Sequence, residues 1–190
     1  MEISDPNSNI EQELIKNCKQ EDNIEAKEAL YKHYYSYAMS ISLRYAYTKD
    51  EAVMIVNDSF LKVYDNIHSY NSKYPFRAWF KRILINTAID RYRSNITRIK
   101  NVEPITTVDT LPNHYEDIVS KLTVNDIMAL LNELTEHQRI IFNLCEVEGY
   151  SHKEIAQKLE IAISTSRSSL TRAKAKLREL FKLKFGTSYE

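Results

Sequence analysis

The sequence predicts an all-α protein of two helical domains joined by a flexible linker, with a helix-turn-helix in the second domain. Two observations lead to this fold class. Apolar residues recur every three or four positions through most of the chain, which places them along one side of a helix. This repeat stops between about Ile96 and His114 and then resumes, so the 190 residues divide into two parts, each long enough for a core of its own.

Three helices are expected in the first part of the chain. The clearest apolar stripe has a strict 3-4-3-4 spacing and consists of Val53, Val56, Phe60, Val63 and Ile67. Another stripe lies within Leu30–Ile41, and a third helix is expected from about Phe76 to Tyr92. Because none of these segments alternates as a strand does, we assign residues 8–95 to a helical domain.

The interruption in the middle of the chain predicts a linker, which we assign to residues 96–120. Pro104 and Pro112 each lack a backbone donor and disfavour helix in the residue before them. Nearly twenty residues without a regular pattern exceed the usual length of a loop in a compact domain. Such a segment is either disordered or held by a partner.

The second domain, residues 121–186, has strong helix boundary signals. Thr135 with Gln138 and Ser151 with Glu154 each fit a capping box, in which the first residue caps a helix and the second bonds back to it. Gly149 supplies the left-handed residue that ends a helix.

These boundaries predict four helices in the second domain. They cover residues 123–134, 136–146, 152–159 and 165–184, with a short turn at 160–164 before the last one. A short helix, a tight turn and a longer basic helix form a helix-turn-helix, whose second helix contacts base edges with its N-terminal side chains.

Several functional classes lack support in the sequence. The two cysteines are far apart, the five histidines fit no metal-ligand spacing, and two glycines are too few for a nucleotide-binding loop. We therefore expect no metal, no cofactor and no enzymatic activity. No apolar stretch is long enough to cross a bilayer, and the first dozen residues do not resemble a signal peptide, so a cytoplasmic location is expected.

The formal net charge of zero results from segments of opposite sign. Residues 1–30 contain three basic and eight acidic residues, whereas 76–100 contain seven basic residues and only one acidic residue. Residues 101–148 contain two basic and nine acidic residues, and 151–185 contain nine basic and three acidic ones. A basic block is either a solvated helix face or a surface that contacts DNA phosphates.

In the last helix, the residue types favour DNA binding over an ordinary basic surface. Arginine can bind guanine through two hydrogen bonds, and Ser or Thr can donate to bases or phosphates. The candidate DNA-binding residues here are Ser164, Thr165, Arg167, Ser168, Thr171, Arg172 and Lys174. Lys176 and Arg178, further along the helix, suit phosphate contacts.

Three segments resemble the extracytoplasmic-function group of bacterial RNA polymerase sigma factors, in the order of that family. EGYSHKEIA followed by TSRSSLTRAK is similar to its C-terminal promoter-binding domain. FRAWFKRILINTAIDR (76–91) is similar to the helix that opens the promoter, and DEAVMIVNDSFLKVY (50–64) to the helix that binds polymerase. The resemblance implies an alternative sigma factor, which would bind core polymerase and direct promoter recognition, DNA melting and initiation.

The resemblance also implies two polymerase contacts, with the clamp coiled coil of the largest subunit and with the flap of the second. The matching clamp-binding residues are Glu51, Asn57, Asp58 and Phe60, although Phe60 fits a core position equally well. The family pattern has Asp and then Gln-Glu where this chain has Met54 and then Asn57 and Asp58.

The family further implies DNA contacts in the first domain, at the minus-ten element. The loop from Ser69 to Phe76 matches the one that captures a flipped base, and phosphate contacts would lie on the following helix. The candidate residues are Tyr70, Asn71, Lys73, Tyr74, Lys81, Arg82, Asn86 and Arg91. Trp79 is expected to belong to the core. In the second domain, the helix-turn-helix would recognise the minus-thirty-five element as duplex.

Other partners and functions remain open at this point. The acidic linker residues Asp109, Glu116 and Asp117 would suit the positively charged active-site and RNA-exit path of polymerase, and an anti-sigma protein is a possible partner. The alternative to a sigma factor is a free-standing helix-turn-helix regulator, which would bind duplex DNA tightly without polymerase. A DNA-tethered nuclease would need a metal or nucleophile cluster, for which the sequence offers no pattern.

Overall fold

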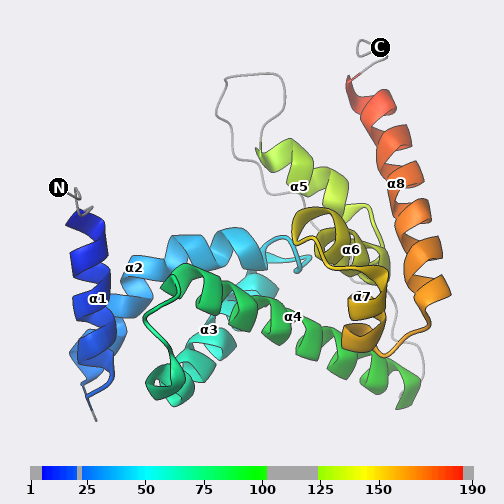
Figure 1. Ribbon diagram of the computed structural model, residues 1–190. Helices are drawn as coiled ribbons and strands as arrows, with labels where there is room; N and C mark the ends of the chain where they lie inside the picture. Colours follow the sequence, from blue (N-terminus) through cyan, green and yellow to red (C-terminus); the bar gives the residue numbers. More distant parts are fainter. Residues whose placement is uncertain (1–5, 21–22, 102–123, 186–190) are drawn as a thin grey trace. The chain divides into compact units, whose positions relative to one another are not determined.

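The computed structural model describes residues 6–20, 23–101 and 124–185, with backbone only for 6–9, 97–101 and 124–125. All regular structure in these ranges is helical (Figure 1). Most of the expected linker, including Asp109, Glu116 and Asp117, lies outside the described residues. None of the described helices is both long and apolar enough to cross a membrane.

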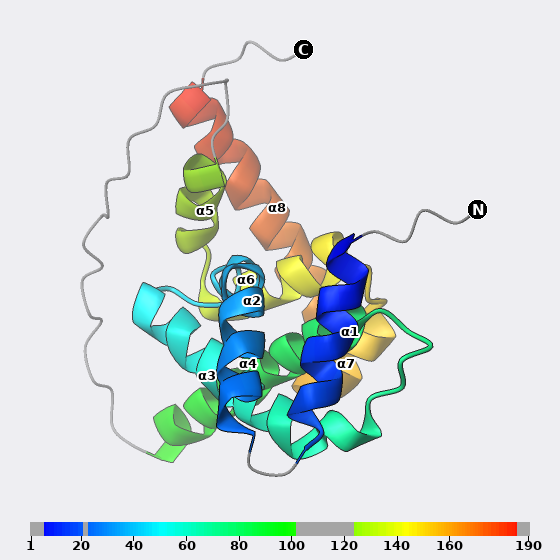
Figure 2. The same ribbon diagram turned by 90° about the vertical axis from the view of Figure 1, so that its left-hand side faces the viewer.

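The first compact unit contains α1 (Pro6–Cys18), α2 (Ile24–Ser42), α3 (Lys49–Asn66) and α4 (Phe76–Asn101) as far as Ala88. A single 3-10 turn, Ile67–Ser69, follows α3. The middle helix, α2, packs against both α1 and α3 (Figure 2).

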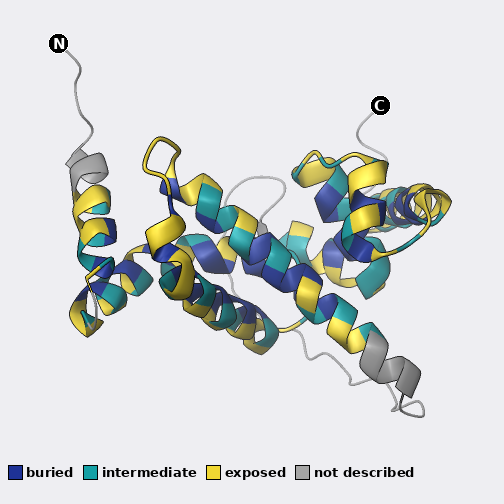
Figure 3. Cartoon of the chain, turned by 60° about the horizontal axis from the view of Figure 1, so that its bottom comes forward, coloured by how far each residue is buried: buried dark blue, intermediate teal, exposed yellow. Residues whose placement is uncertain are grey.

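An aromatic cluster forms the core of this unit. Tyr34, Phe60, Phe76 and Phe80 are each at most 2% exposed. The ring centroids of Phe60 and Phe80 are 4.8 Å apart, and those of Tyr34 and Phe76 are 4.9 Å apart. Such tilted ring pairs stabilise a core beyond the effect of area burial. The 3-4-3-4 stripe from Val53 to Ile67 is buried as predicted, apart from the half-buried Val53 at its start. Figure 3 shows buried and exposed residues alternating along the helices.

Helix α4 is longer than its apolar pattern predicts. It continues to Asn101, well past Tyr92 and into the segment expected to begin the linker. The added turns contain arginine and lysine, which favour helix, and the next proline along the chain is Pro104. Here, local propensity extends the helix where the apolar repeat has ended.

The second compact unit contains the rest of α4, the segment Leu43–Thr48, and the helices of the C-terminal part. These are α5 (Val124–Asn132), α6 (Glu136–Phe142), α7 (His152–Leu159) and α8 (Ile163–Phe185). Helix α8 packs against α5, α6 and α7. Leu131, Leu134 and Ala173 form a buried cluster between α5 and α8, with Met128, Phe142 and Leu177 at its edge.

The predicted boundary signals of this unit are confirmed. Both capping boxes form, at Thr135 before α6 and at Ser151 before α7. Gly149 has a φ of 78°, in the left-handed region that glycine adopts without steric cost. The helix expected over 136–146 differs in one respect, because after Phe142 it widens into a π-helical turn, Asn143–Val147.

A buried arginine connects α6 to Leu43–Thr48 within the second unit. Arg139 is 1% exposed, and its guanidinium donates to the carbonyl oxygens of Leu43 at 2.6 Å and Arg44 at 2.8 Å, and to Asn132 Oδ1 at 2.5 Å. Asn143 Nδ2 also donates to the Arg44 carbonyl, at 2.7 Å. These acceptors satisfy a charge that would be costly to bury alone.

Candidate nucleic-acid interface

Helices α7 and α8 form the predicted helix-turn-helix. Ser151 starts α7, and hydrogen bonds from its hydroxyl and its N–H to the Glu154 carboxylate, at 2.7 and 2.8 Å, lower the pKa of Glu154. At the other end of α7, Glu160 turns the chain with a φ of 54°. His152 Nδ1 and Ser166 Oγ, 2.9 Å apart, connect the two helices.

The N-terminal end of α8 presents the predicted duplex-binding residues on an open surface. The exposed ones are Ser164, Arg167, Ser168, Thr171 and Arg172, whereas Thr165 and Lys174 are half-buried. On a helix, residues four apart lie one above the other, so Arg172 is next to Ser168 and Arg167 is next to Thr171. The structure therefore brings these residues together in two adjacent rows.

Some of these side chains already have partners within the unit. Thr171 Oγ1 donates to the Arg167 carbonyl at 3.0 Å, and Ser168 Oγ donates to the Thr165 carbonyl at 3.2 Å. The Lys174 ammonium lies 2.8 Å from a carboxylate oxygen of Glu146. A DNA contact by Lys174 would have to replace this ion pair, whereas the two exposed arginines extend into solvent.

The loop between the 3-10 turn and α4 separates a buried tyrosine from exposed polar residues. Tyr70 is 8% exposed, and its ring centroid lies 5.3 Å from that of Phe76, in an edge-on pair, and 5.2 Å from that of Trp79, in a tilted pair. This corrects the prediction that Tyr70 offers a stacking face, because both neighbours already cover the ring. Asn71, Lys73 and Tyr74 are exposed, and Tyr74 is the open aromatic of the loop, at 66%.

The predicted phosphate-binding residues of α4 do not share one face. Arg82 and Asn86 are four residues apart and lie on the same side of the helix. Nine residues, two and a half turns, separate Arg82 from Arg91, which therefore point to opposite sides. Arg82 is exposed, whereas Lys81, Asn86 and Arg91 are half-buried.

The predicted polymerase-binding residues all lie on α3, and all but one are at least partly exposed. Asn57 is exposed, Glu51 and Asp58 are half-buried, and the Tyr31 hydroxyl donates to Asn57 Oδ1 at 3.0 Å. Phe60 is 2% exposed and packs on Phe80, so it is a core residue rather than a contact residue. This corrects the part of the prediction that assigned Phe60 to a partner.

Two exposed apolar residues join this face of α3. Met54 is 43% exposed and Leu61 is 62% exposed, and they lie two turns apart on one side of the helix. Leu61 was missed by the sequence analysis, although its position seven residues after Met54 could have indicated it. We call the group Glu51, Met54, Asn57, Asp58 and Leu61 the α3 face.

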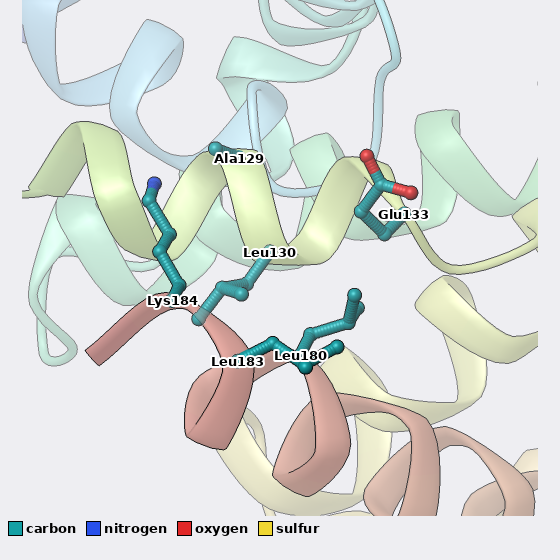
Figure 4. Close-up of a pocket in the computed structure, with 6 residues that line it drawn as sticks. All are labelled: Ala129, Leu130, Glu133, Leu180, Leu183 and Lys184. Atoms are coloured by element: carbon teal, nitrogen blue, oxygen red, sulfur yellow. The ribbon is translucent and has the colours of Figure 1, made fainter. Parts of the chain in front are cut away.

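An apolar groove lies between α5 and the C-terminal end of α8 (Figure 4). It has a volume of about 290 Å³ and is lined by Ala129, Leu130, Glu133, Leu180, Leu183 and Lys184. Leu183 is 77% exposed at its edge. An ion pair of 2.8 Å between Lys184 and Asp126 connects the two helices there.

Metal-binding and reactive groups are the remaining kinds of candidate site in the described ranges. Residues 6–20, 23–101 and 124–185 contain no group of three His, Cys, Asp or Glu side chains placed to hold a metal. Burial raises the pKa of the Cys18 thiol to about 11, which keeps it in the protonated, unreactive form.

Comparison with known proteins supports the order of the modules. Residues 30–97 match the family model for sigma-70 region 2, and residues 125–177 match the one for sigma-70 region 4. The RNA polymerase sigma factor NccH of Alcaligenes xylosoxydans xylosoxydans is 30% identical over 131 residues, which cover 66% of this chain and 70% of that protein.

Two further proteins extend the similarity over more of the chain. The ECF RNA polymerase sigma-E factor of Haemophilus influenzae is 26% identical over 86% of this chain and 91% of its own length. The sigma factor RpoE of Bartonella quintana, solved with the anti-sigma factor NepR, has a similar fold, with a TM-score of 0.50, 23% identity, and coverage of 93% of this chain and 99% of that one.

Both family models match in the expected order, and the similarity to the sigma factor NccH covers about two thirds of each protein. These matches give no support to a free-standing helix-turn-helix regulator. The chain therefore belongs to the extracytoplasmic-function group of the sigma-70 family, as an alternative sigma factor that directs transcription initiation.

Proposed function

We propose that this sigma factor recognises a promoter with two separate surfaces. The N-terminal half of α8 binds the minus-thirty-five element as duplex, and the loop from Ser69 to Phe76, here called the minus-ten loop, captures an unpaired base of the minus-ten element. The main supporting observation is that the side chains of Arg167, Arg172 and Tyr74 are all exposed to solvent. Each has the chemistry that its target requires.

The two surfaces use different physical interactions. Arginine recognises guanine in the major groove through paired hydrogen bonds, which discriminate between bases by about 1–3 kcal/mol. A flipped base loses its stacking and pairing, and stacking on an aromatic ring such as Tyr74 returns about 1–3 kcal/mol. Binding energy alone can therefore hold DNA strands apart, so the proposed role needs neither ATP nor an enzymatic activity of this chain.

The α3 face is the proposed contact with the clamp coiled coil of polymerase. Its carboxylates, Glu51 and Asp58, suit an arginine-rich partner, since charge-assisted hydrogen bonds are strong even at a partly exposed interface. Met54 and Leu61 add apolar area to the same face. This combination supports a contact in which Met54 compensates in part for the carboxylate that the family pattern has at its position.

The groove between α5 and α8 is the proposed site for the polymerase flap. Its apolar lining, with Glu133 and Lys184 at the edge, suits an apolar segment flanked by polar groups. We expect Leu183→Asp to weaken binding to core polymerase while leaving the preference for minus-ten sequences unchanged. Unchanged core affinity would exclude the groove as a flap contact.

The most direct test of the function uses purified core polymerase. We expect core polymerase with this protein to start transcription at a subset of genomic promoters in a run-off assay, and the protein alone to show no comparable specific duplex binding. No affinity for core polymerase at low salt would contradict the proposal. Tight specific binding without polymerase would instead favour a free-standing regulator.

The proposed place of action is the cytoplasm, where bacterial RNA polymerase and the chromosome are found. An anti-sigma protein is a further proposed partner, supported by the similar fold of a sigma factor solved in complex with one. Copurification of the tagged chain from its own host, with identification of the bound proteins, tests both partners together.

A further inference from the structure

Tyr70 attaches the minus-ten loop to the aromatic core of the first unit. The Tyr70 hydroxyl donates to the Tyr74 carbonyl at 2.6 Å, across the loop. Burial, with a smaller contribution from the Glu11 carboxylate of α1, raises the pKa of Tyr70, so the phenol keeps the proton that it donates. Within the loop, the Tyr74 N–H bonds to the Asn71 carbonyl at 3.2 Å, and the Lys73 N–H bonds to Asn71 Oδ1 at 3.0 Å. The position of Tyr70 therefore affects the whole loop.

A lysine from the N-terminal segment contacts this tyrosine. Lys19 directly follows α1, and its Nζ lies 3.4 Å from the Tyr70 carbonyl oxygen and 5.9 Å from the centroid of the Tyr70 ring. Helix α1 itself is fixed to the unit, since Ile15 and Cys18 are buried and α1 packs along α2. Lys19 precedes residues 30–97, the segment that matches sigma-70 region 2.

We propose that Lys19 is a positioning residue for the minus-ten loop, which it holds in its base-capturing geometry through Tyr70. The inference rests on the proposed role of that loop in base capture. The ammonium donates to one end of the loop and lies over the ring whose hydroxyl holds the other end. A charged donor of this kind stabilises its acceptor more than a neutral one does. The segment before region 2 thereby contributes to promoter opening without contacting DNA.

A direct phosphate contact by Lys19 is the competing role. Lys19 is half-buried and directed at a protein carbonyl, which favours positioning. Lys16, three residues earlier in the last turn of α1, is exposed and provides a matched control, because Lys16→Met removes the same charge from the same N-terminal segment. Lys19→Met keeps the length of the side chain and removes the donor, and Lys19→Arg restores a charged donor.

The first experiment measures amide hydrogen exchange in the free full-length protein. We expect Lys19→Met to speed exchange of the Lys73 and Tyr74 amides roughly threefold to tenfold, the effect of losing one partly exposed charge-assisted bond. Lys16→Met should leave both amides at the wild-type rate, and Lys19→Arg should restore most of the protection. If the Lys73 and Tyr74 amides of Lys19→Met exchange at the wild-type rate, the positioning role of Lys19 is overturned, whether or not the loop binds DNA.

The second experiment uses holoenzyme and single-stranded nontemplate oligonucleotides, chosen by selection for tight binding. The measured quantity is the ratio of affinities for the selected oligonucleotide and for the same one with an abasic site at the flipped position. We expect Lys19→Met to lower this ratio about threefold to tenfold, with an unchanged salt dependence. Lys16→Met should keep the wild-type ratio.

Two other results would overturn the role of Lys19. An equal loss for both oligonucleotides, with a weaker salt dependence, would assign Lys19 to a phosphate contact. An unchanged affinity ratio in Lys19→Met would show that Lys19 has no role in recognition of the flipped base. Tyr74→Ala distinguishes these failures from failure of the proposed function, because a wild-type ratio in Tyr74→Ala would show that the loop itself does not capture the base.

Discussion

Side chains on α8 differ in how much information about DNA sequence they can provide. Arg172 is exposed in the N-terminal half of α8, the half through which a recognition helix contacts base edges, whereas Arg178 is exposed almost two turns further along. An arginine that bonds to a base edge discriminates between sequences, and one that contacts a phosphate does not. The position of each arginine on the helix therefore predicts the kind of effect its loss will have.

Substitution of Arg172 tests this difference. Arg172→Ala is expected to reduce discrimination at one position of the minus-thirty-five element by about 1–3 kcal/mol, because a base contact is lost. Arg178→Ala should weaken the binding of holoenzyme to all promoters to a similar extent. Holoenzyme affinity for a set of promoters with single substitutions measures both. Unchanged promoter selection in Arg172→Ala would remove the assignment of α8 as the recognition helix.

The turn of the helix-turn-helix contains a residue other than glycine in an unfavourable backbone conformation. Glu160 has a φ of 54°, a left-handed geometry that disfavours any residue with a Cβ. Its carboxylate lies 2.9 Å from the Arg93 guanidinium, but the Glu160 side chain is 76% exposed, so this ion pair contributes little. The backbone effect should dominate the result of a substitution.

Glu160→Gly is therefore expected to raise the free energy of unfolding by about 0.5–1 kcal/mol, the steric relief less the added entropy of the unfolded chain. Glu160→Ala loses the same ion pair and keeps the unfavourable conformation, so it should not be stabilised. Urea unfolding of the two variants provides the comparison. Equal stability of the Gly and Ala variants would argue against strain at this turn.

At the scale of elements, helix packing in the second unit includes a titratable contact. The hydroxyl oxygen of Tyr92 on α4 lies 2.5 Å from Nδ1 of His137 on α6. Burial lowers the pKa of His137 below its usual value of 6.5. The folded protein therefore binds fewer protons at this site than the unfolded chain, and the neutral ring can accept a hydrogen bond from the Tyr92 hydroxyl.

The sign of this pKa shift predicts a pH effect on stability. As pH falls below about 6.5, the unfolded chain gains a proton that the folded state resists, so stability falls. His137→Gln should reduce this loss between pH 7.5 and 5.5, whereas His68→Gln, at an exposed position, should retain it. Urea unfolding at the two pH values, with an NMR titration of His137, measures the effect. An equal pH dependence in His137→Gln and wild type would contradict the assignment.

At the scale of the whole molecule, the two proposed DNA-binding surfaces belong to separate compact units. Tyr74 lies in the first unit and Arg172 in the second. Substitutions at distant, independent sites usually have additive free energies, within about 0.5 kcal/mol. The fractional transcription rates of a Tyr74 variant and an Arg172 variant should therefore multiply when the two substitutions are combined.

The double variant Tyr74→Ala, Arg172→Ala tests this independence. We expect its initiation rate on a promoter with both elements to equal the product of the two fractional rates of the single variants, because one variant weakens duplex binding and the other weakens base capture. Abortive initiation assays with saturating core polymerase measure all three variants together. A much smaller combined loss would mean that the two surfaces act in one coupled step.

Much of the fold could be predicted from local sequence patterns. Both capping boxes, the left-handed Gly149 and the α3 stripe depend on residues within a few positions of one another, so their spacing is visible in the chain. The exposure of Arg167, Ser168, Thr171 and Arg172 on α8, where recognition is proposed, also followed from helical spacing. Helix α4 was predicted too short because arginine and lysine extend a helix without adding to the apolar repeat.

The sequence by itself determined most of the helices, the boundaries marked by the two capping boxes and Gly149, and the order of the two sigma-factor modules, because helix capping and apolar periodicity are local properties. Only the tertiary structure decided which aromatic side chains face solvent. Phe60 and Tyr70 are buried by aromatic rings from α4, whereas Tyr74, in the same loop as Tyr70, remains open. The physical reason is that burial depends on neighbours distant along the chain, which a residue type and a spacing do not specify.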